Sequence, residues 1–418
     1  MISRLLILSF VTGIFTGIFI LFYAIFTKTL SSLLFFGDPM QTIQTLPHWY
    51  IYLVTISSIY IVNYIIRKND KIKEYGVKEI ALAVEKNGIV FSLKDLLLKI
   101  FVSALSLASG FAVGNEGPSA AIGAMIAHKF HNLFKLPKHL VKVALSVGAS
   151  SGIAAIFVSP ITGIMFAIEN IAYEFLKNYA GYLITSSFLA FSIASYFLDS
   201  LVFGYESINK RLDYYYLVSS FLFIPIITLF IYLYLLLKDK ILYILKNKIQ
   251  PHILKYEDII ISIVSGSIIA TILIINPYAA FSGHEIVKIL IDDNFHLPLN
   301  MIFIIILLRI IATVVSLYAN AVGGIFIALM SIGALIGYGF AELSNELLTW
   351  QVEPFFFAAI GAAVFMGVLM RLPLTAIVLA LEITYDYNVV IPTGLIVVVV
   401  TYLVTLNFNL KKLVLKER

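Results

Sequence analysis

The sequence predicts an all-α integral membrane protein, and three observations support this: the composition, the length of the apolar runs and an internal repeat. Hydrophobic residues make up 61% of the 418 residues, charged residues only 13%, and the mean hydropathy is +0.98. A water-soluble domain of this composition would expose a largely apolar surface. Since a helix of about 20 apolar residues crosses a bilayer, apolar runs from end to end predict multiple spans.

The first apolar run, residues 5–26, follows Arg4 and carries no small-residue cleavage site. It is long enough to cross a bilayer, so we expect a true span and not a removed signal peptide. The basic residues gather in short polar segments between apolar runs, and the positive-inside rule places such segments in the cytoplasm. These segments are residues 67–78, 128–142, 238–248 and 411–418.

That placement predicts a multi-pass protein of the cell (inner) membrane, in contact with lipid and with a cytoplasmic C-terminus. It also explains the net charge of +5 without a nucleic-acid partner. The absence of cysteine excludes disulfides and thiolate metal sites. His128 and His131 have no acidic partner nearby that would suggest zinc, so no metal or cofactor is expected.

Several apolar runs are too short for a simple crossing. Pro160 interrupts one apolar segment, and Arg371-Leu372-Pro373 interrupts another. Such interruptions favour tilted, broken or re-entrant helices over straight ones. Because non-helical backbone is tolerated at membrane depth only under protein cover or beside a watery cavity, the interruptions predict a permeation path.

An internal repeat relates these interrupted segments. Residues 148–169 align without a gap with residues 361–382, which matches Gly148 with Gly361 and Glu169 with Glu382. Paired halves with interrupted helices at corresponding positions are typical of transporter folds.

A second pair of matching segments lies just upstream. Residues 112–126 align with residues 321–336 when one residue is inserted. The predicted organisation is therefore a first transmembrane repeat over 1–205, a second over 212–410 and a short basic cytoplasmic tail over 411–418.

Both upstream segments place glycines directly before a helical run. Glycine lets an ion approach the backbone closely. A helix that begins there leaves its first N–H groups unpaired and carries a partial positive charge, which makes an anion site without a basic side chain. Weak binding of this kind lets the anion leave again.

Four motifs, taken in order, resemble the CLC chloride channel/transporter family over nearly the whole chain. They are GNEGP at 114–118, GIMFAIE at 163–169, GGIFIA at 323–328 and LPLTAIVLALEIT at 372–384. The resemblance implies the CLC-type fold of two inverted-topology repeats, with one pore per subunit in a homodimer. The family's soluble nucleotide-binding tail is not expected here.

The resemblance also implies roles for individual residues. Glu116 matches the gating glutamate, which occupies the anion site when charged, withdraws when protonated and so accepts the transported proton. Burial favours the neutral acid and nearby helix N-termini favour the carboxylate. The alternative is a glutamate that only caps a helix. The residues implied to bind the anion are Tyr75, Gly114, Asn115, Gly117, Gly324, Ile325 and Phe326.

The sequence departs from the family near the anion site. Asn115 stands where the family usually has Lys or Arg, which removes a fixed positive charge. In EYGVKEI, residues 74–80, Tyr75 replaces a serine that coordinates the central anion. Its hydroxyl can also donate a hydrogen bond, although an interfacial anchor in a loop is the alternative role.

Two further departures concern the inner side. Asn170 replaces the inner proton-relay glutamate, and an amide cannot relay a proton by titration. The preceding Glu169 has a match in the other repeat, so structural pairing or capping is its expected role. The tyrosine of the family's inner gate would fall near Leu413, where none is present.

The leading functional prediction is proton-coupled anion exchange, with chloride as the anion. A passive chloride channel is the alternative, favoured by Asn170 and the missing inner tyrosine. Fluoride/proton antiport is a third reading, because Asn115 resembles that branch, but the apolar GGIFIA is chloride-like. An intramembrane hydrolase would need a histidine base near GASSGIA, residues 148–154. All seven histidines lie in or beside polar loops, so we expect no enzyme.

Overall fold

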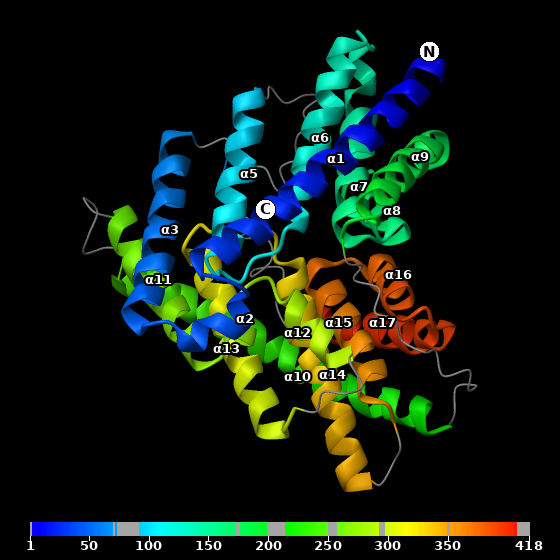
Figure 1. The fold of residues 1–418 in the computed structure, drawn as a ribbon. Coiled ribbons are helices and arrows are strands. Elements are labelled where there is room, and N and C mark those ends of the chain that lie inside the picture. Colours follow the sequence, from blue (N-terminus) through cyan, green and yellow to red (C-terminus); the bar gives the residue numbers. More distant parts are fainter. Residues whose placement is uncertain are drawn as a thin grey trace. The chain divides into compact units, whose positions relative to one another are not determined.

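The computed structural model describes residues 2–69, 72, 92–172, 176–198, 214–249, 257–291, 297–348 and 352–407. Within these ranges the chain is almost entirely helical, and its extended pairing is limited to one isolated antiparallel bridge (Figure 1). Eight of the described helices are long and apolar enough to cross a bilayer. The predicted all-α integral membrane fold is confirmed.

The helices form two compact units whose segments interleave along the sequence. The first unit comprises Met1–Leu201, Leu242–Gly283 and Ala312–Ala328, and the second comprises Val202–Ile241, His284–Ile311 and Leu329–Arg418. The division of the chain into repeats over 1–205 and 212–410 stays a prediction. Both its junction and the basic tail fall outside the described residues.

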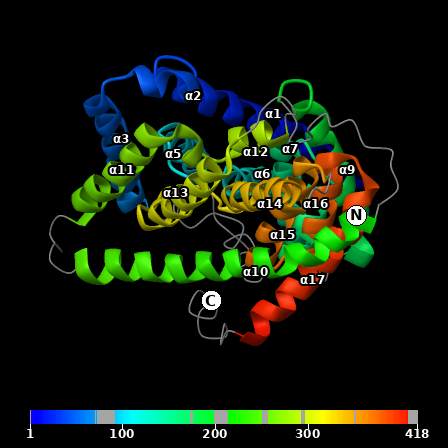
Figure 2. The same cartoon turned by 90° about the horizontal axis from the view of Figure 1, so that it is seen from below.

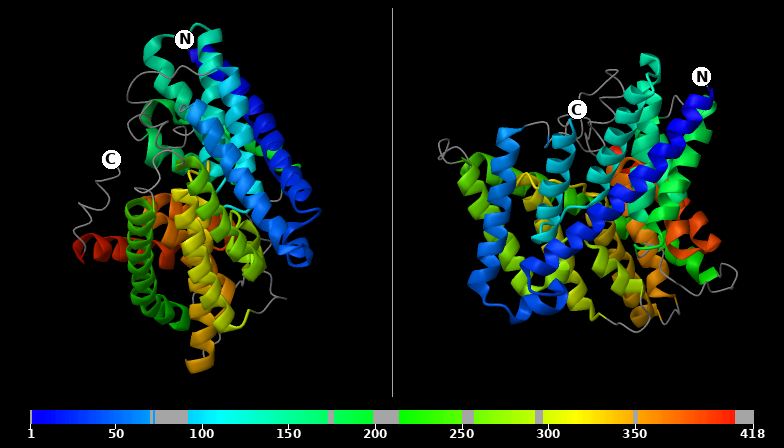
Figure 3. Two further views of the ribbon diagram at one scale, coloured as in Figure 1. Left: turned by 90° about the vertical axis from the view of Figure 1, so that its left-hand side faces the viewer. Right: turned by 45° about the horizontal axis from the view of Figure 1, so that its top comes forward.

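The first unit contains most of the helices from the N-terminal half. Its helices are α1 (Ile2–Leu34), α2 (Pro39–Thr42), α3 (His48–Lys68), α5 (Leu93–Ala108), α6 (Glu116–Leu133), α7 (Val141–Phe157), α8 (Pro160–Ala167), α9 (Leu176–Ala194) and α11 (Glu257–Ile275). The long α1 packs against α5, α6, α7 and α9 (Figure 3). Figure 2 shows α3 and α11 side by side.

The second unit is built from later helices. They are α10 (Tyr214–Tyr243), α12 (His284–Ile291), α15 (Pro354–Met370), α16 (Pro373–Thr384) and α17 (Val390–Asn407). The last two residues of α10 belong to the first unit, and two more helices also have residues in both units: α13 (Leu299–Tyr318) ends in the first unit, and α14 (Phe326–Leu348) begins there. In the second unit α15, α16 and α17 pack against one another.

The predicted helix breaks are present in both repeats and have the same local geometry. Val158 follows α7 with φ of 50°, and Arg371 follows α15 with φ of 60°. Pro160 and Pro373 are then the first residues of α8 and α16. A left-handed residue ends each helix, and proline starts the next because its missing N–H lies where no helical hydrogen bond is needed.

Small residues allow the helices around these breaks to touch through their backbones. A Cβ added to Gly123 on α6 or to Gly148 on α7 would overlap the backbone carbonyl of the other glycine. In the second unit, Gly333 on α14 and Gly361 on α15 face each other in the same way. The match of Gly148 with Gly361 in the sequence therefore corresponds to a repeated helix crossing.

Replacing Gly148 by alanine is expected to destabilise the protein, because the added methyl group must push α6 and α7 apart. Overpacking of this kind costs about 1 to 3 kcal/mol. The measurement is thermal unfolding of the purified protein in detergent. Gly181→Ala on α9 is the matched control, since its Cβ would meet nothing within 4 Å. Equal melting temperatures for the two variants would contradict the expected close crossing.

Candidate functional site

Two glycine loops meet inside the first unit. The first glycine loop, residues 109–115, joins α5 to α6, and the second glycine loop, residues 319–325, joins α13 to α14. The N–H of Gly114 donates to the carbonyl of Gly324 at 2.6 Å, and the N–H of Gly324 donates to the carbonyl of Gly114 at 2.8 Å. This pair of bonds joins the loops directly in front of α6 and α14.

The register of this pairing differs from the sequence alignment. Gly114 pairs with Gly324, α6 begins at Glu116, and α14 begins at Phe326. The number of positions from Gly114 to Gly324 is the same as the number from Glu116 to Phe326. Gly110 and Asn320 keep this spacing, and each has a positive φ, of 97° and 58° respectively. The one-residue insertion was therefore wrong: the letters Ala-Val-Gly, at 112–114 and 321–323, do not occupy equivalent backbone positions.

A pair of buried serines supports the loops reciprocally. Ser106 on α5 accepts a hydrogen bond from the N–H of Val322 at 3.0 Å. Ser316 on α13 accepts one from the N–H of Ala112 at 2.9 Å. Both hydroxyls also donate to a carbonyl of their own helix and are fully buried. Thus α5 provides an acceptor for an N–H of the second glycine loop, and α13 provides one for an N–H of the first. Buried N–H groups are almost always hydrogen-bonded in this way.

Glu116 is the first residue of α6, and its side chain is only 2% exposed. Its Oε1 atom accepts a hydrogen bond from the N–H of Phe326, the first residue of α14, at 2.5 Å. Its Oε2 atom has no hydrogen-bond partner among the described residues. The carboxyl group therefore lies at the N-terminus of a helix other than its own.

Two glycines make the space for this carboxyl group. A Cβ added to Gly114 would lie 2.6 Å from the Glu116 Cδ atom, and one added to Gly324 would lie 2.7 Å from it. A helix N-terminus presents backbone N–H groups and partial positive charge to any anion that reaches it. The carboxyl group therefore occupies a space beside the first N–H of α14, bounded by the backbone of two glycines.

Of the other residues predicted to bind the anion, those in the described part of the chain lie in or beside the same loops. Asn115 is partly buried, and its Oδ1 atom has no hydrogen-bond partner within the described part of the chain. Gly117 lies beside Gly324, because a Cβ on Gly117 would be 3.4 Å from the Gly324 Cα. Ile325 is partly buried at the end of the second glycine loop. Tyr75 lies outside the described residues.

Phe326 has a second role besides its backbone N–H. Its ring packs on Phe157 at 4.8 Å and on Phe166 at 5.8 Å between ring centroids. By the register of the loops, Phe326 occupies the position in the second repeat that Glu116 occupies in the first. One repeat therefore contributes the acid, and the other contributes an apolar anchor that fixes the start of α14.

Asn170 belongs to neither glycine loop and to neither helix that the loops precede. Together with Glu169 it belongs to a π-helical turn, Ile168–Ala172, that follows α8. Both side chains are partly buried. Among the described residues, no hydrogen bond or ion pair joins Asn170 to Glu116.

Sequence reasoning missed several buried polar residues near the site. Tyr23 on α1 is fully buried, its hydroxyl lies 2.6 Å from Ser103 Oγ on α5, and it is close enough to Glu116 to interact electrostatically. Lys99 on α5 is 2% exposed and donates to the carbonyl of Ile72 at 2.6 Å. Ile72 lies three positions before Tyr75 in the sequence.

The second repeat has a buried cation at the position equivalent to Lys99. Arg309 on α13 is fully buried and precedes Gly324 by the same interval that separates Lys99 from Gly114. Ionisable residues inside membrane helices are rare and mark functional sites. A single basic residue within an apolar run was the sequence signal for both residues.

The serines of the GASSGIA segment have ordinary structural contacts. Ser150 and Ser151 on α7 both donate to the carbonyl of Val147, at 3.0 and 2.7 Å. Ser151 also contacts Ser186 on α9. These contacts are typical of small residues that let helices pack closely in a membrane.

Comparison with known proteins agrees with this architecture. The family model described as "voltage gated chloride channel" matches residues 53–406. The fold is similar to that of a slow cyanobacterial Cl⁻/H⁺ antiporter, with a TM-score of 0.82, 21% identity and coverage of 96% of this chain and 95% of the other. A CLC-type fluoride/proton antiporter has a TM-score of 0.75, 18% identity and coverage of 96% and 95%. A eukaryotic CLC transporter has a TM-score of 0.71, 18% identity and coverage of 96% and 72%.

Proposed function

Because the chain belongs to the voltage-gated chloride channel (CLC) family, we propose that it exchanges chloride for protons across a membrane, with Glu116 as the gating and proton-accepting residue. Members of this family are transporters and channels, so the chain is not an enzyme. The proposal concerns the finer function, namely the coupling of the anion to the proton and the residue that performs it.

One observation carries the proposal: the Glu116 carboxyl group accepts the N–H of Phe326 at the N-terminus of α14. A charged carboxylate held there occupies the place where an anion would be stabilised. Protonation removes the charge, weakens this hold and frees the site for an anion. A proton and an anion then compete for one position, which is the basis of exchange.

Chloride is the anion that we favour. The segment GGIFIA, residues 323–328, carries no polar side chain, so the site offers backbone N–H groups and little else to the ion. The similar structures include both a Cl⁻/H⁺ and a fluoride/proton antiporter. Asn115, whose Oδ1 atom has no partner among the described residues, is the feature that supports fluoride as the competing substrate.

A passive chloride channel is the second candidate, and Asn170 is the observation that favours it. An amide does not titrate and cannot pass a proton from the inner side towards Glu116. If no other route delivers the proton, Glu116 gates the pore without transporting protons.

The protein would work in the cell (inner) membrane as a homodimer, surrounded by lipid. The clustering of basic residues in the polar segments and the tail supports a cytoplasmic C-terminus. Chloride and protons are its proposed partners, with fluoride as the alternative anion, and no nucleic acid is involved.

The test is anion-driven proton movement in proteoliposomes of the purified protein. A chloride gradient is expected to drive protons against their own gradient, and a fluoride gradient is expected to drive fewer. Chloride flux without any proton movement would make the protein a channel. A larger proton flux with fluoride would overturn the choice of chloride.

A further inference from the structure

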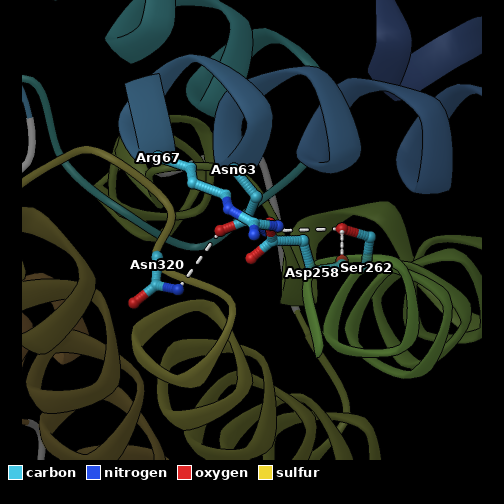
Figure 4. Close-up of polar contacts among 5 residues, drawn as sticks. All are labelled: Asn63, Arg67, Asp258, Ser262 and Asn320. Carbon is cyan, nitrogen blue, oxygen red and sulfur yellow. Dashed lines mark hydrogen bonds and ion pairs between the residues drawn. The ribbon is translucent and has the colours of Figure 1, made fainter. Parts of the chain in front are cut away.

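The second glycine loop is connected to α3 and α11 by a cluster of polar side chains that is buried except for the partly buried Asn320, in addition to its contacts with the first loop. The cluster consists of Asn63 on α3, Ser262 on α11 and Asn320 in the loop (Figure 4). All three residues belong to the first unit. A buried polar side chain in a membrane helix requires hydrogen-bond partners, and here some of the partners belong to the second glycine loop.

Asn63 lies at the centre of this cluster and is 3% exposed. Its Nδ2 atom donates to the carbonyl of Ala319 at 3.2 Å and to Ser262 Oγ at 3.3 Å. Its Oδ1 atom accepts from Asn320 Nδ2 at 3.2 Å. A single side chain on α3 thus holds both a backbone atom and a side chain at the start of the second glycine loop.

Asn320 has a backbone conformation that few side chains adopt, with φ of 58°. The equivalent residue of the first glycine loop is Gly110, with φ of 97°. Glycine reaches this region without steric cost, and asparagine tolerates it better than most residues. Asn320 therefore provides the same turn as Gly110 and adds a hydrogen bond that glycine cannot make.

The turn at Asn320 sets the direction of the segment that reaches Glu116. Downstream of Asn320, Val322 binds Ser106, Gly324 pairs with Gly114, and the N–H of Phe326 donates to Glu116. The turn at Asn320 and the N–H of Phe326 thus belong to one short segment, which has hydrogen bonds at both of its ends.

Resting on the proposed function, we infer that Asn63 and Asn320 are positioning residues of the gate. They hold the second glycine loop so that the N–H of Phe326 points at the Glu116 carboxylate. The Arg67–Asp258 ion pair at 3.0 Å joins α3 and α11 near the same cluster, but Arg67 is 76% exposed, so its contribution to the site is small (Figure 4).

The test is the pH dependence of chloride flux in proteoliposomes containing the full-length Asn320→Gly variant. Glycine keeps the turn, as Gly110 does, and removes only the bond to Asn63. A less fixed Phe326 N–H stabilises the charged carboxylate less, so Glu116 is protonated at a higher pH. The midpoint of the flux curve is expected to move upwards by about half a pH unit or more. Asn63→Ser, which loses the bonds to Ala319 and Asn320, is expected to shift it further.

Tyr52→Phe is the matched control, because it removes a 2.8 Å hydrogen bond between α3 and α11, to Thr271, without touching the loop. Tyr23 on α1 is a titratable side chain that interacts electrostatically with Glu116, and none of these variants replaces it. The residues that face Glu116 from the second glycine loop and from α14 carry no charge. Thermal unfolding in detergent identifies any variant that fails to fold.

The outcomes separate this inference from the proposed function. Wild-type flux that changes with pH, together with loss of that change in Glu116→Gln, would support the gating role of Glu116. If both asparagine variants then keep the wild-type midpoint, the positioning role of Asn63 and Asn320 is refuted, and the gating role of Glu116 is retained. An equal shift in Tyr52→Phe would also refute it, since any loosening of α3 and α11 would then suffice. If wild-type flux ignores pH altogether, the proposed function itself has failed.

Discussion

Replacing Glu116 by glutamine is expected to abolish proton transport while chloride flux persists and becomes independent of pH. The amide has nearly the shape of the protonated acid but cannot gain or lose a proton. It also carries no charge to compete with an anion at the N-terminus of α14. The measurement compares proton and chloride movement in the same proteoliposomes, and the proton signal is expected to fall to the level of empty vesicles.

The control for this variant is Glu285→Gln, the same change at an exposed carboxylate of α12. It should leave both fluxes at wild-type values. Residual proton pumping by Glu116→Gln would show that another residue accepts the proton. Loss of chloride flux together with proton flux, in a protein that still folds, would mean that Glu116 is required for permeation and not for coupling.

Replacing Gly324 by alanine is expected to remove the pH dependence and to reduce chloride flux at least about tenfold, which corresponds to roughly 1.4 kcal/mol. The new Cβ would lie 2.7 Å from the Glu116 Cδ atom, so the carboxyl group could not keep its position. The same methyl group would fill the space that an anion needs beside the N–H of Phe326. Flux measured across a pH series tests both effects.

Gly394→Ala on α17 provides the comparison, since its Cβ would make only ordinary contacts, at 3.5 and 3.9 Å from Ile377. Its flux and unfolding temperature are expected to match the wild type. If Gly324→Ala retained a normal pH profile, the carboxyl group would have to act from a position other than the one between the two glycines.

Much of the fold could be predicted from the sequence because its signals are local. The apolar runs and the breaks at Pro160 and Pro373 depend on residues close in the chain, and the match of Gly148 with Gly361 came from comparing two such local patterns. The approach of Glu116 to the second glycine loop was predictable for another reason: glycine-led helix starts and a buried acid are recognisable as motifs.

The register of the two glycine loops could not be predicted in the same way. The letters Ala-Val-Gly occur in both segments, yet the backbone equates Gly114 with Gly324 and Gly110 with Asn320. A left-handed turn can be made by glycine or by asparagine, so residue identity is a poor guide to it. Hydrogen-bond pairing, which the sequence does not display, decides the register.

The supporting side chains were hidden for a related reason. Asn63, Ser106 and Ser316 each look like an isolated polar residue in an apolar run, and nothing nearby in the chain identifies their partners. Asn63 bonds to residues more than 250 positions away. Single polar residues in membrane helices indicate that a partner exists, but only the tertiary structure shows which one.

The Gly114–Gly324 bridge also has a consequence for biosynthesis. Residues 312–328 complete the first compact unit, although they are translated long after the rest of its N-terminal helices. Contacts between residues so far apart in sequence form slowly and late in folding. A nascent chain that ends at the predicted boundary of the first repeat lacks Gly324 and Phe326. Its Glu116 would be left in the bilayer without those backbone partners until the ribosome has produced most of the polypeptide.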